Sequence, residues 1–196
     1  MTGVGRRSFL RGALVGAGAA AVTGMTVTAD AATSISLPFH GIHQAGIDTP
    51  PQRQAVFASF DVIAADKGEL KDLLQTLTDR ARLLTAGGAL PPLGITAPPA
   101  DSGVLGPDMP GDDLTVTVGV GASLFDDRYG LKDRKPAKLT AMKTFPNDTL
   151  DDSQCHGDLS LQLCATDTDT VLHALRDIAR HTRGGMQLRW RVDGFQ

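Results

Sequence analysis

Cysteine, aromatic residues and basic charge are all scarce in this chain of 196 residues. Only two cysteines are present, Cys155 and Cys164, so a framework of several disulfides is excluded, and a single bridge between the two stays open. Aromatic residues make up 5% of the chain, and 22 acidic residues outnumber 19 basic ones. Because the sequence has no basic face and no arginine-rich arm, we expect no nucleic-acid partner.

Long hydrophobic runs are also missing, and the one apolar stretch lies near the N-terminus. Residues 13–27 are apolar but rich in glycine, which makes them too short and too weakly hydrophobic for a stable membrane span. They follow the pair Arg6-Arg7 and the letters SFL, a pattern that resembles a twin-arginine export signal. We therefore expect a periplasmic or extracellular protein with no stable membrane span once the signal is removed.

The small residues of the Ala-Asp-Ala sequence at 29–31 predict the cleavage site, so residues 1–31 form the expected signal peptide. The mature chain would begin near Ala32 with 16 basic and 21 acidic residues, a formal net charge of −5. Its length of about 165 residues suits a single domain with a sizeable hydrophobic core. Residues 32–54 contain three prolines and are expected to form an extended arm before the domain at 55–196.

The domain repeats the order strand, helix, strand twice. Asp66 with Glu69 predicts a capping box at the start of the first helix, Gly87-Gly88 ends it, and Asp167 or Asp169 caps the second. The expected elements are strands at 55–63, 114–120, 159–163 and 186–192, a proline- and glycine-rich loop at 89–113, and an insertion at 123–152 with a short helix near 135–143. This order predicts an α+β fold, a ferredoxin-like βαββαβ antiparallel sheet with both helices on one face.

Alternation along the strands assigns residues to the two faces of this sheet. We expect the helices to cover Val56, Phe60, Val116, Val118, Leu161, Leu163, Leu188 and Trp190. The other face then presents Thr115, Thr117, Ser160, Gln162, Cys164, Gln187, Arg189 and Arg191. Such a face suits water or a second sheet, so a partner sheet or a homo-oligomer is expected to cover it.

No histidine is assigned to a cofactor or metal site. His40 and His43 are spaced for chelation only if the glycine-containing arm were helical, and His173 and His181 are expected on the solvated side of the last helix. Zinc sites usually draw ligands from two separated pairs, whereas the cluster at 155–158 (CHGD) stands alone. We therefore interpret that cluster as a turn into the next strand.

Neighbouring carboxylates are not assigned a catalytic role either. The pairs Asp126-Asp127 and Asp151-Asp152 lie in polar loop sequence, where adjacent acidic residues are usually solvated. The sequence also has no Gly-x-Ser-x-Gly elbow, no phosphate loop and no Gly-x-Gly-x-x-Gly after a strand.

Several long phrases, in order, resemble the dye-decolorising (DyP-type) haem peroxidase family. They are FHGIHQAGIDTP, DSGVLGPDMPGDDLTVTVGVGASLFDDRYGL, FPNDTLDDSQCHGDLSLQLCA, HALRDIAR and LRWRVDGF, and they extend over about residues 38–194. Within the family they look most like the exported deferrochelatase/peroxidase branch. The resemblance implies haem b as cofactor, oxidation of bulky reductants by hydrogen peroxide, a link to iron release from haem, and two ferredoxin-like domains.

The family's haem-site residues are not found in this chain. The family carries its distal aspartate in a Gly-x-x-Asp-Gly motif, followed by the axial histidine and distal arginine, and this chain has no such motif. The resemblance therefore assigns no catalytic, cofactor-binding or metal residue here, and implies an N-terminal part whose haem-ligating domain is absent, or supplied by a second polypeptide. Alternatively, the chain is a stand-alone ferredoxin-like module that self-associates and lacks peroxidase activity.

Overall fold

The computed structural model describes residues 37–89, 104–105 and 108–196. They belong to one compact unit, Ser34–Gln196. The expected signal peptide and most of the proline- and glycine-rich loop lie outside the described residues. Among the residues that are described, no helix is both long and apolar enough to cross a membrane.

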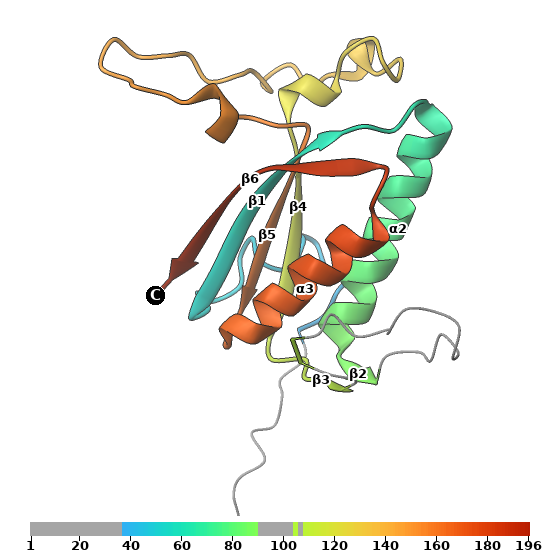
Figure 1. Cartoon of the computed structure of the whole chain (residues 1–196), viewed down its shortest axis with the longest axis vertical. Helices are drawn as coiled ribbons and strands as arrows, with labels where there is room; N and C mark the ends of the chain where they lie inside the picture. The colour runs from blue at the N-terminus through green and yellow to red at the C-terminus, as the bar shows by residue number, and fades with distance from the viewer. Residues whose placement is uncertain (1–36, 90–103, 106–107) are drawn as a thin grey trace, which may run out of the picture. The chain divides into compact units, whose positions relative to one another are not determined.

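The fold is a four-stranded antiparallel sheet with two helices on one of its faces (Figure 1). The strands β1 (Gln54–Val62), β4 (Thr115–Val120), β5 (Leu159–Ala165) and β6 (Met186–Phe195) lie in the order β4-β5-β1-β6. Helices α2 (Lys67–Ala86) and α3 (Thr168–His181) connect β1 to β4 and β5 to β6, and a two-residue ladder joins β2 (Gly88–Ala89) to β3 (Asp108–Met109). This confirms the predicted ferredoxin-like α+β fold.

The helix ends follow the capping signals of the sequence. The Asp66 carboxylate accepts hydrogen bonds from the backbone amides of Gly68 (2.7 Å) and Glu69 (2.9 Å), and the Glu69 carboxylate accepts one from the Ala65 amide (2.7 Å). These bonds satisfy backbone donors that a helix start leaves without partners. At the other end Gly87 adopts a positive φ of 68°, a conformation that favours glycine. Of the two predicted caps of α3, the structure places Asp167 at the N-cap position.

The hydrophobic core fills the space between the sheet and the helices. Its largest fully buried apolar side chains come from the strands, both helices and the turn before β4: Phe60, Leu77, Leu84, Leu114, Leu159, Leu161, Leu163, Val171 and Ile178. The two helices are also joined by an ion pair, because Arg80 on α2 donates two hydrogen bonds of 2.8 Å to the buried carboxylate of Asp177 on α3.

The connection from β4 to β5 is long and irregular, and it differs from the prediction. It contains only three short 3-10 turns, at Ala122–Leu124, Lys132–Arg134 and Asp152–Gln154, so the short helix expected near 135–143 is wrong. Pro136 ends the turn before it, because a residue before proline avoids the helical region. Lys135 accordingly has φ −61° and ψ 126°, which ends the Lys132–Arg134 turn.

Candidate functional site

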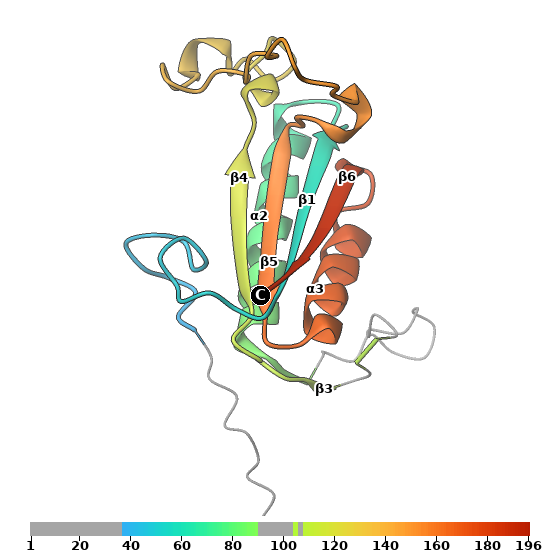
Figure 2. The same ribbon diagram turned by 90° about the vertical axis from the view of Figure 1, so that its left-hand side faces the viewer.

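The face of the sheet that the helices leave uncovered is the candidate functional site, and Figure 2 looks onto it. We call it the open face, and the strand pairings place on it Phe57, Ser59, Asp61, Thr115, Thr117, Ser160, Gln162, Cys164, Trp190 and Val192. The predicted polar residues of β4 and β5 are therefore confirmed on this side. An apolar patch accompanies them on β1 and β6: the ring of Phe57, 42% exposed, stacks on Trp190 with 6.4 Å between centroids, and Val192 beside them is 59% exposed.

A β-bulge in β6 corrects part of the predicted face assignment. Phe60 pairs with Leu188, whereas its neighbour Ser59 pairs with Trp190, so one extra residue stands in β6 at that point. Simple alternation fails beyond a bulge, because the extra residue moves every later side chain to the opposite face. Trp190 was expected under the helices but lies on the open face. Arg191 was expected on the open face but lies opposite the buried Ala58.

One end of the open face is bounded by the turn before β5. The carbonyl oxygen of His156 accepts hydrogen bonds from the Ser59 hydroxyl (2.6 Å) and from the Trp190 indole N–H (2.8 Å). His156 has a positive φ of 61°, and Gly157 follows with φ 133°, where a Cβ atom would overlap the Ser59 hydroxyl. Arg189 adds hydrogen bonds of 2.8 Å to two further carbonyl oxygens of this loop. The turn predicted at 155–158 is confirmed, and it is fixed to β1 and β6.

A buried carboxylate ties the loop after β4 to the same end of the sheet. Asp158 accepts hydrogen bonds from the Val62 amide (2.9 Å), the Ser123 hydroxyl (2.6 Å) and the guanidinium of Arg128 (3.1 Å). Arg128 also donates to the Asp126 carboxylate (2.6 Å). Burial raises the pKa of Asp126, but hydrogen bonds from the backbone and side chain of Arg128 outweigh it and hold that pKa below its usual value. These polar groups position the loop and are all engaged with one another.

The two edges of the sheet differ in how they are protected. Along β4 the side-chain amide of Gln44 binds the backbone as a neighbouring strand would. It donates to the Val118 carbonyl (3.0 Å) and accepts from the Val118 N–H (2.9 Å). The Thr117 hydroxyl donates to the Ala45 carbonyl (2.7 Å). In the part of the chain that the structure describes, β6 pairs only with β1, so its outer edge is uncovered. An uncovered edge invites pairing with another segment.

The Gln44 contact yields a direct prediction. We expect Gln44→Ala to speed amide hydrogen exchange at Val118 several-fold, because one backbone donor loses a partner worth about 1 kcal/mol. Exchange measured by NMR on the matched variant Gln75→Ala, which alters an exposed glutamine of α2, should leave Val118 unchanged. Equal exchange at Val118 in both variants would show that the arm does not protect this edge.

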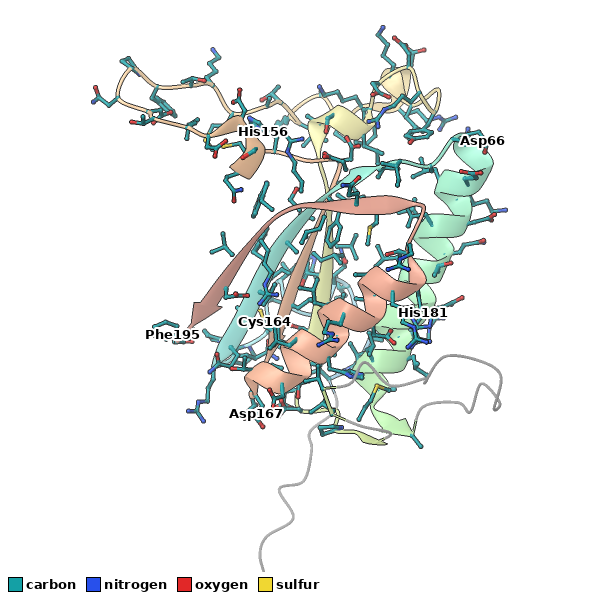
Figure 3. All side chains as sticks on the ribbon, viewed as in Figure 1. Asp66, His156, Cys164, Asp167, His181 and Phe195 are labelled. Carbon is teal, nitrogen blue, oxygen red and sulfur yellow. The ribbon has the colours of Figure 1, made fainter. Side chains whose placement is uncertain are left out.

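The histidines are spread over the molecule and do not gather at the open face. His40 and His43 are exposed in the arm, and His156 and His181 are exposed as well (Figure 3). The prediction for His181 is confirmed, but that for His173 is wrong: His173 is 2% exposed, with its Nε2 atom 2.8 Å from the Met109 sulfur. The β2–β3 ladder brings Met109 against α3, a contact that the spacing within α3 cannot disclose.

The cysteines and acidic pairs form no metal centre either. Cys164 lies in β5 at the end opposite the turn that holds Cys155, and both are free thiols, so the bridge left open by the sequence is not formed. Among the described residues no group of three or more histidine, cysteine or acidic side chains could hold a metal ion. The expectation that these carboxylates are solvated holds for Asp127, Asp151 and Asp152, which are exposed, while Asp126 is held by Arg128.

Three structural features of this region were not predicted from the sequence. The hydrogen bonds of Gln44 to Val118 have no signal in the sequence, because a glutamine in an irregular arm is compatible with any exposed position. The bond between Arg128 and Asp158 joins residues 30 positions apart and follows from the tertiary fold alone. The aromatic pair of Phe57 and Trp190 depends on the bulge.

Comparison with known proteins agrees with this architecture. Residues 44–196 match the model of the family described as Dyp-type peroxidase, N-terminal. The chain is 50% identical to a deferrochelatase of Yersinia pestis over 158 residues, 81% of this chain and 36% of that protein. It is 46% identical to a deferrochelatase of Escherichia coli over 200 residues, 97% of this chain and 47% of that protein.

Solved structures give the same family. A DyP-type peroxidase from Cellulomonas bogoriensis matches with a TM-score of 0.71 and 35% identity, covering 83% of this chain and 43% of that one. DtpA from Streptomyces lividans, in an oxyferrous complex, matches with a TM-score of 0.70 and 37% identity, covering 83% and 42%. The chain thus spans between about a third and a half of the length of these relatives. Because the family model covers most of its residues, the chain belongs to the DyP-type peroxidase family and corresponds to its N-terminal part.

Proposed function

We propose that this chain is the N-terminal part of an exported DyP-type haem peroxidase that uses hydrogen peroxide to oxidise bulky reductants. Haem b is the cofactor of the proposed protein, and removal of iron from haem is a second activity that the name of the deferrochelatase relatives suggests. The residues at 1–31 support export by the twin-arginine route to the periplasm or the extracellular space. The observation that carries the proposal is the match over residues 44–196.

In this proposal the described domain supplies a docking surface for a second ferredoxin-like sheet. The aromatic pair of Phe57 and Trp190 and the exposed Val192 offer apolar area on the open face, and the polar threonines and glutamine beside them suit hydrogen bonds across an interface. Protection of the β4 edge by Gln44 leaves the β6 side as the place where further backbone pairing can occur. The chain would thereby position the second sheet and exclude water from the region between the two.

The side chains described here do not fit a haem site. Haem in this role needs an axial ligand in an enclosed apolar pocket. Four of the five histidines are exposed, and His173 is packed against a methionine sulfur. A groove of about 730 Å³ along α2 is lined in part by Lys67, Lys71 and Arg82 and by no histidine. Two smaller hollows, of about 390 and 410 Å³, are lined by His40 and His43 of the arm, and both of these side chains are exposed. We therefore derive no chemical step through haem in this chain and assign its ligand to another part of the proposed protein.

A haem titration of the purified chain tests this assignment. We expect no tight, stoichiometric Soret band. Any weak Soret absorbance should not change when His40, His43, His156, His173 and His181 are replaced by alanine one at a time. A stoichiometric band that a single one of these replacements abolishes would show that the ligand lies in this chain. Near-UV circular dichroism of each variant serves as the control for folding.

The same open face would also suit a second copy of the chain, which is the stand-alone alternative. Sedimentation velocity over a wide concentration range distinguishes the two, because self-association through this face buries the only tryptophan of the chain. A monomeric profile with an unchanged emission maximum of Trp190 would count against the stand-alone module and leave the peroxidase proposal intact.

A further inference from the structure

One part of the connection between β4 and β5 is basic, although the whole connection, residues 121–158, has seven acidic and six basic residues. We call residues 134–143 the basic tip. It contains Arg134, Lys135, Lys138 and Lys143 with no acidic residue among them, in a chain whose formal net charge is −3. All four are exposed, and none forms an ion pair with any carboxylate of the described residues. By contrast Lys132, just before the tip, is paired with Asp127 at 3.0 Å. The tip therefore presents four cations without an ion-pair partner among the described residues, and the exposed Asp133 and Asp148 flank it in the sequence.

Large apolar side chains lie exposed in the same connection. Met142 is 79% exposed, Phe145 59% and Leu150 56%. Exposed apolar residues are ordinary when they are scattered singly, but these three fall within nine positions that overlap the end of the basic tip and also include Asp148. The connection, yellow to orange at the top of Figure 1, lies beyond the end of the sheet and away from the contact between α2 and α3.

The base of this connection is held firmly although its tip is irregular. Arg128 and Asp158 fix its two ends to β1, and Arg189 on β6 binds the returning segment through two carbonyl oxygens. Within the tip one local turn is closed by the Leu139 amide, which donates to the Pro136 carbonyl (3.0 Å). The cations are thus displayed from a defined place on the fold, which limits the entropy lost when they meet a surface.

We propose that the basic tip docks this protein on an anionic lipid surface. Phosphate headgroups would neutralise the four cations, while Met142 and Phe145 would enter the boundary between headgroups and acyl chains. Because the remainder of the chain is acidic, the same surface would repel the other faces and orient the protein with its tip toward the lipid. This peripheral contact requires no membrane span, and it does not depend on the peroxidase proposal.

Vesicle sedimentation of the full chain tests the proposal. The tip variant R134Q/K135Q/K138Q/K143Q is compared with the matched variant K67Q/K71Q/R176Q/R183Q, which removes four exposed cations from α2, α3 and the turn after α3. One lysine or arginine contributes roughly five-fold to partitioning onto anionic lipid. We expect the tip variant to bind vesicles containing phosphatidylglycerol at least about ten-fold more weakly than the matched variant. Equal loss in both variants would overturn the proposal, because it would reflect net charge alone.

A local measurement distinguishes lipid binding by the tip from lipid binding by the basic N-terminal segment, which both variants retain. Trypsin should cleave the unaltered chain within residues 134–143 several-fold more slowly with phosphatidylglycerol vesicles than with phosphatidylcholine vesicles. Cleavage at Arg53, exposed in the arm, serves as the internal reference. Equal cleavage rates in the tip with both lipids would refute docking.

Discussion

Replacement of Asp158 by alanine is expected to lower the free energy of unfolding by about 2–4 kcal/mol. The carboxylate is 4% exposed and accepts hydrogen bonds from Val62, Ser123 and Arg128. Its loss leaves the Val62 amide at the end of β1 buried without a partner, which costs more than the bond itself contributes. The part of this loss that comes from the Arg128 hydrogen bonds is smaller, because the Arg128 side chain is 41% exposed and water can solvate it.

Urea denaturation followed by circular dichroism measures this loss. The matched control is Asp127→Ala, which breaks an exposed pair with Lys132 and should cost less than about 0.5 kcal/mol. The variant Asp158→Asn retains one acceptor oxygen for the Val62 amide and should fall between the two. A stability of Asp158→Ala equal to that of the Asp127 control would contradict the view that this carboxylate fixes the loop to the sheet.

The consequence reaches beyond stability, since Asp158 lies next to the turn that bounds the open face. The His156 carbonyl is bound by Ser59 and Trp190 on one side of the turn. On the other side the Ser123 hydroxyl lies 3.1 Å from the Gly157 carbonyl oxygen and 2.6 Å from the Asp158 carboxylate. Loosening this turn would release the indole N–H of Trp190 and disturb its stack on Phe57. The emission of the sole tryptophan should therefore shift in Asp158→Ala under conditions in which the chain remains folded.

Local patterns of the sequence were enough to predict the architecture. Alternation in β4 and β5 identified both faces of those strands, and the Asp66 and Glu69 pair marked the start of α2 to the residue. These signals succeed because they arise within a few residues, where backbone hydrogen bonding and side-chain direction are set by the immediate neighbours. The ferredoxin-like order then follows from the sequence of elements.

Features that depend on distant partners could not be predicted in this way. The bulge that moves Trp190 to the open face is set by its pairing with Ser59, far away in the chain. Burial of His173 depends on Met109, and protection of β4 depends on the arm at Gln44. For the site itself, the resemblance indicated the family, but the surface that β6 presents required the register of the folded sheet.

The second large effect concerns the ion pair between the helices. We expect Asp177→Ala to lower the free energy of unfolding by about 3–5 kcal/mol, because it leaves the Arg80 guanidinium without its partner in a poorly solvated place. The Asp177 side chain is 1% exposed and that of Arg80 18%, and their two hydrogen bonds of 2.8 Å are the polar link between α2 and α3. Thermal unfolding and urea denaturation should both report the loss, whereas Asp79→Ala, at an exposed pair with Arg82, should cost less than about 0.5 kcal/mol.

A double variant decides between two explanations. Either the ion pair itself stabilises the fold, or Asp177→Ala is destabilising only because it leaves the Arg80 charge without a partner. Apolar residues of similar volume often replace a buried ion pair without loss of stability, since no charge then has to be removed from water on folding. Arg80→Met with Asp177→Leu should therefore recover most of the stability that Asp177→Ala loses. If the double variant stays as unstable as the single one, the charges themselves hold α2 against α3.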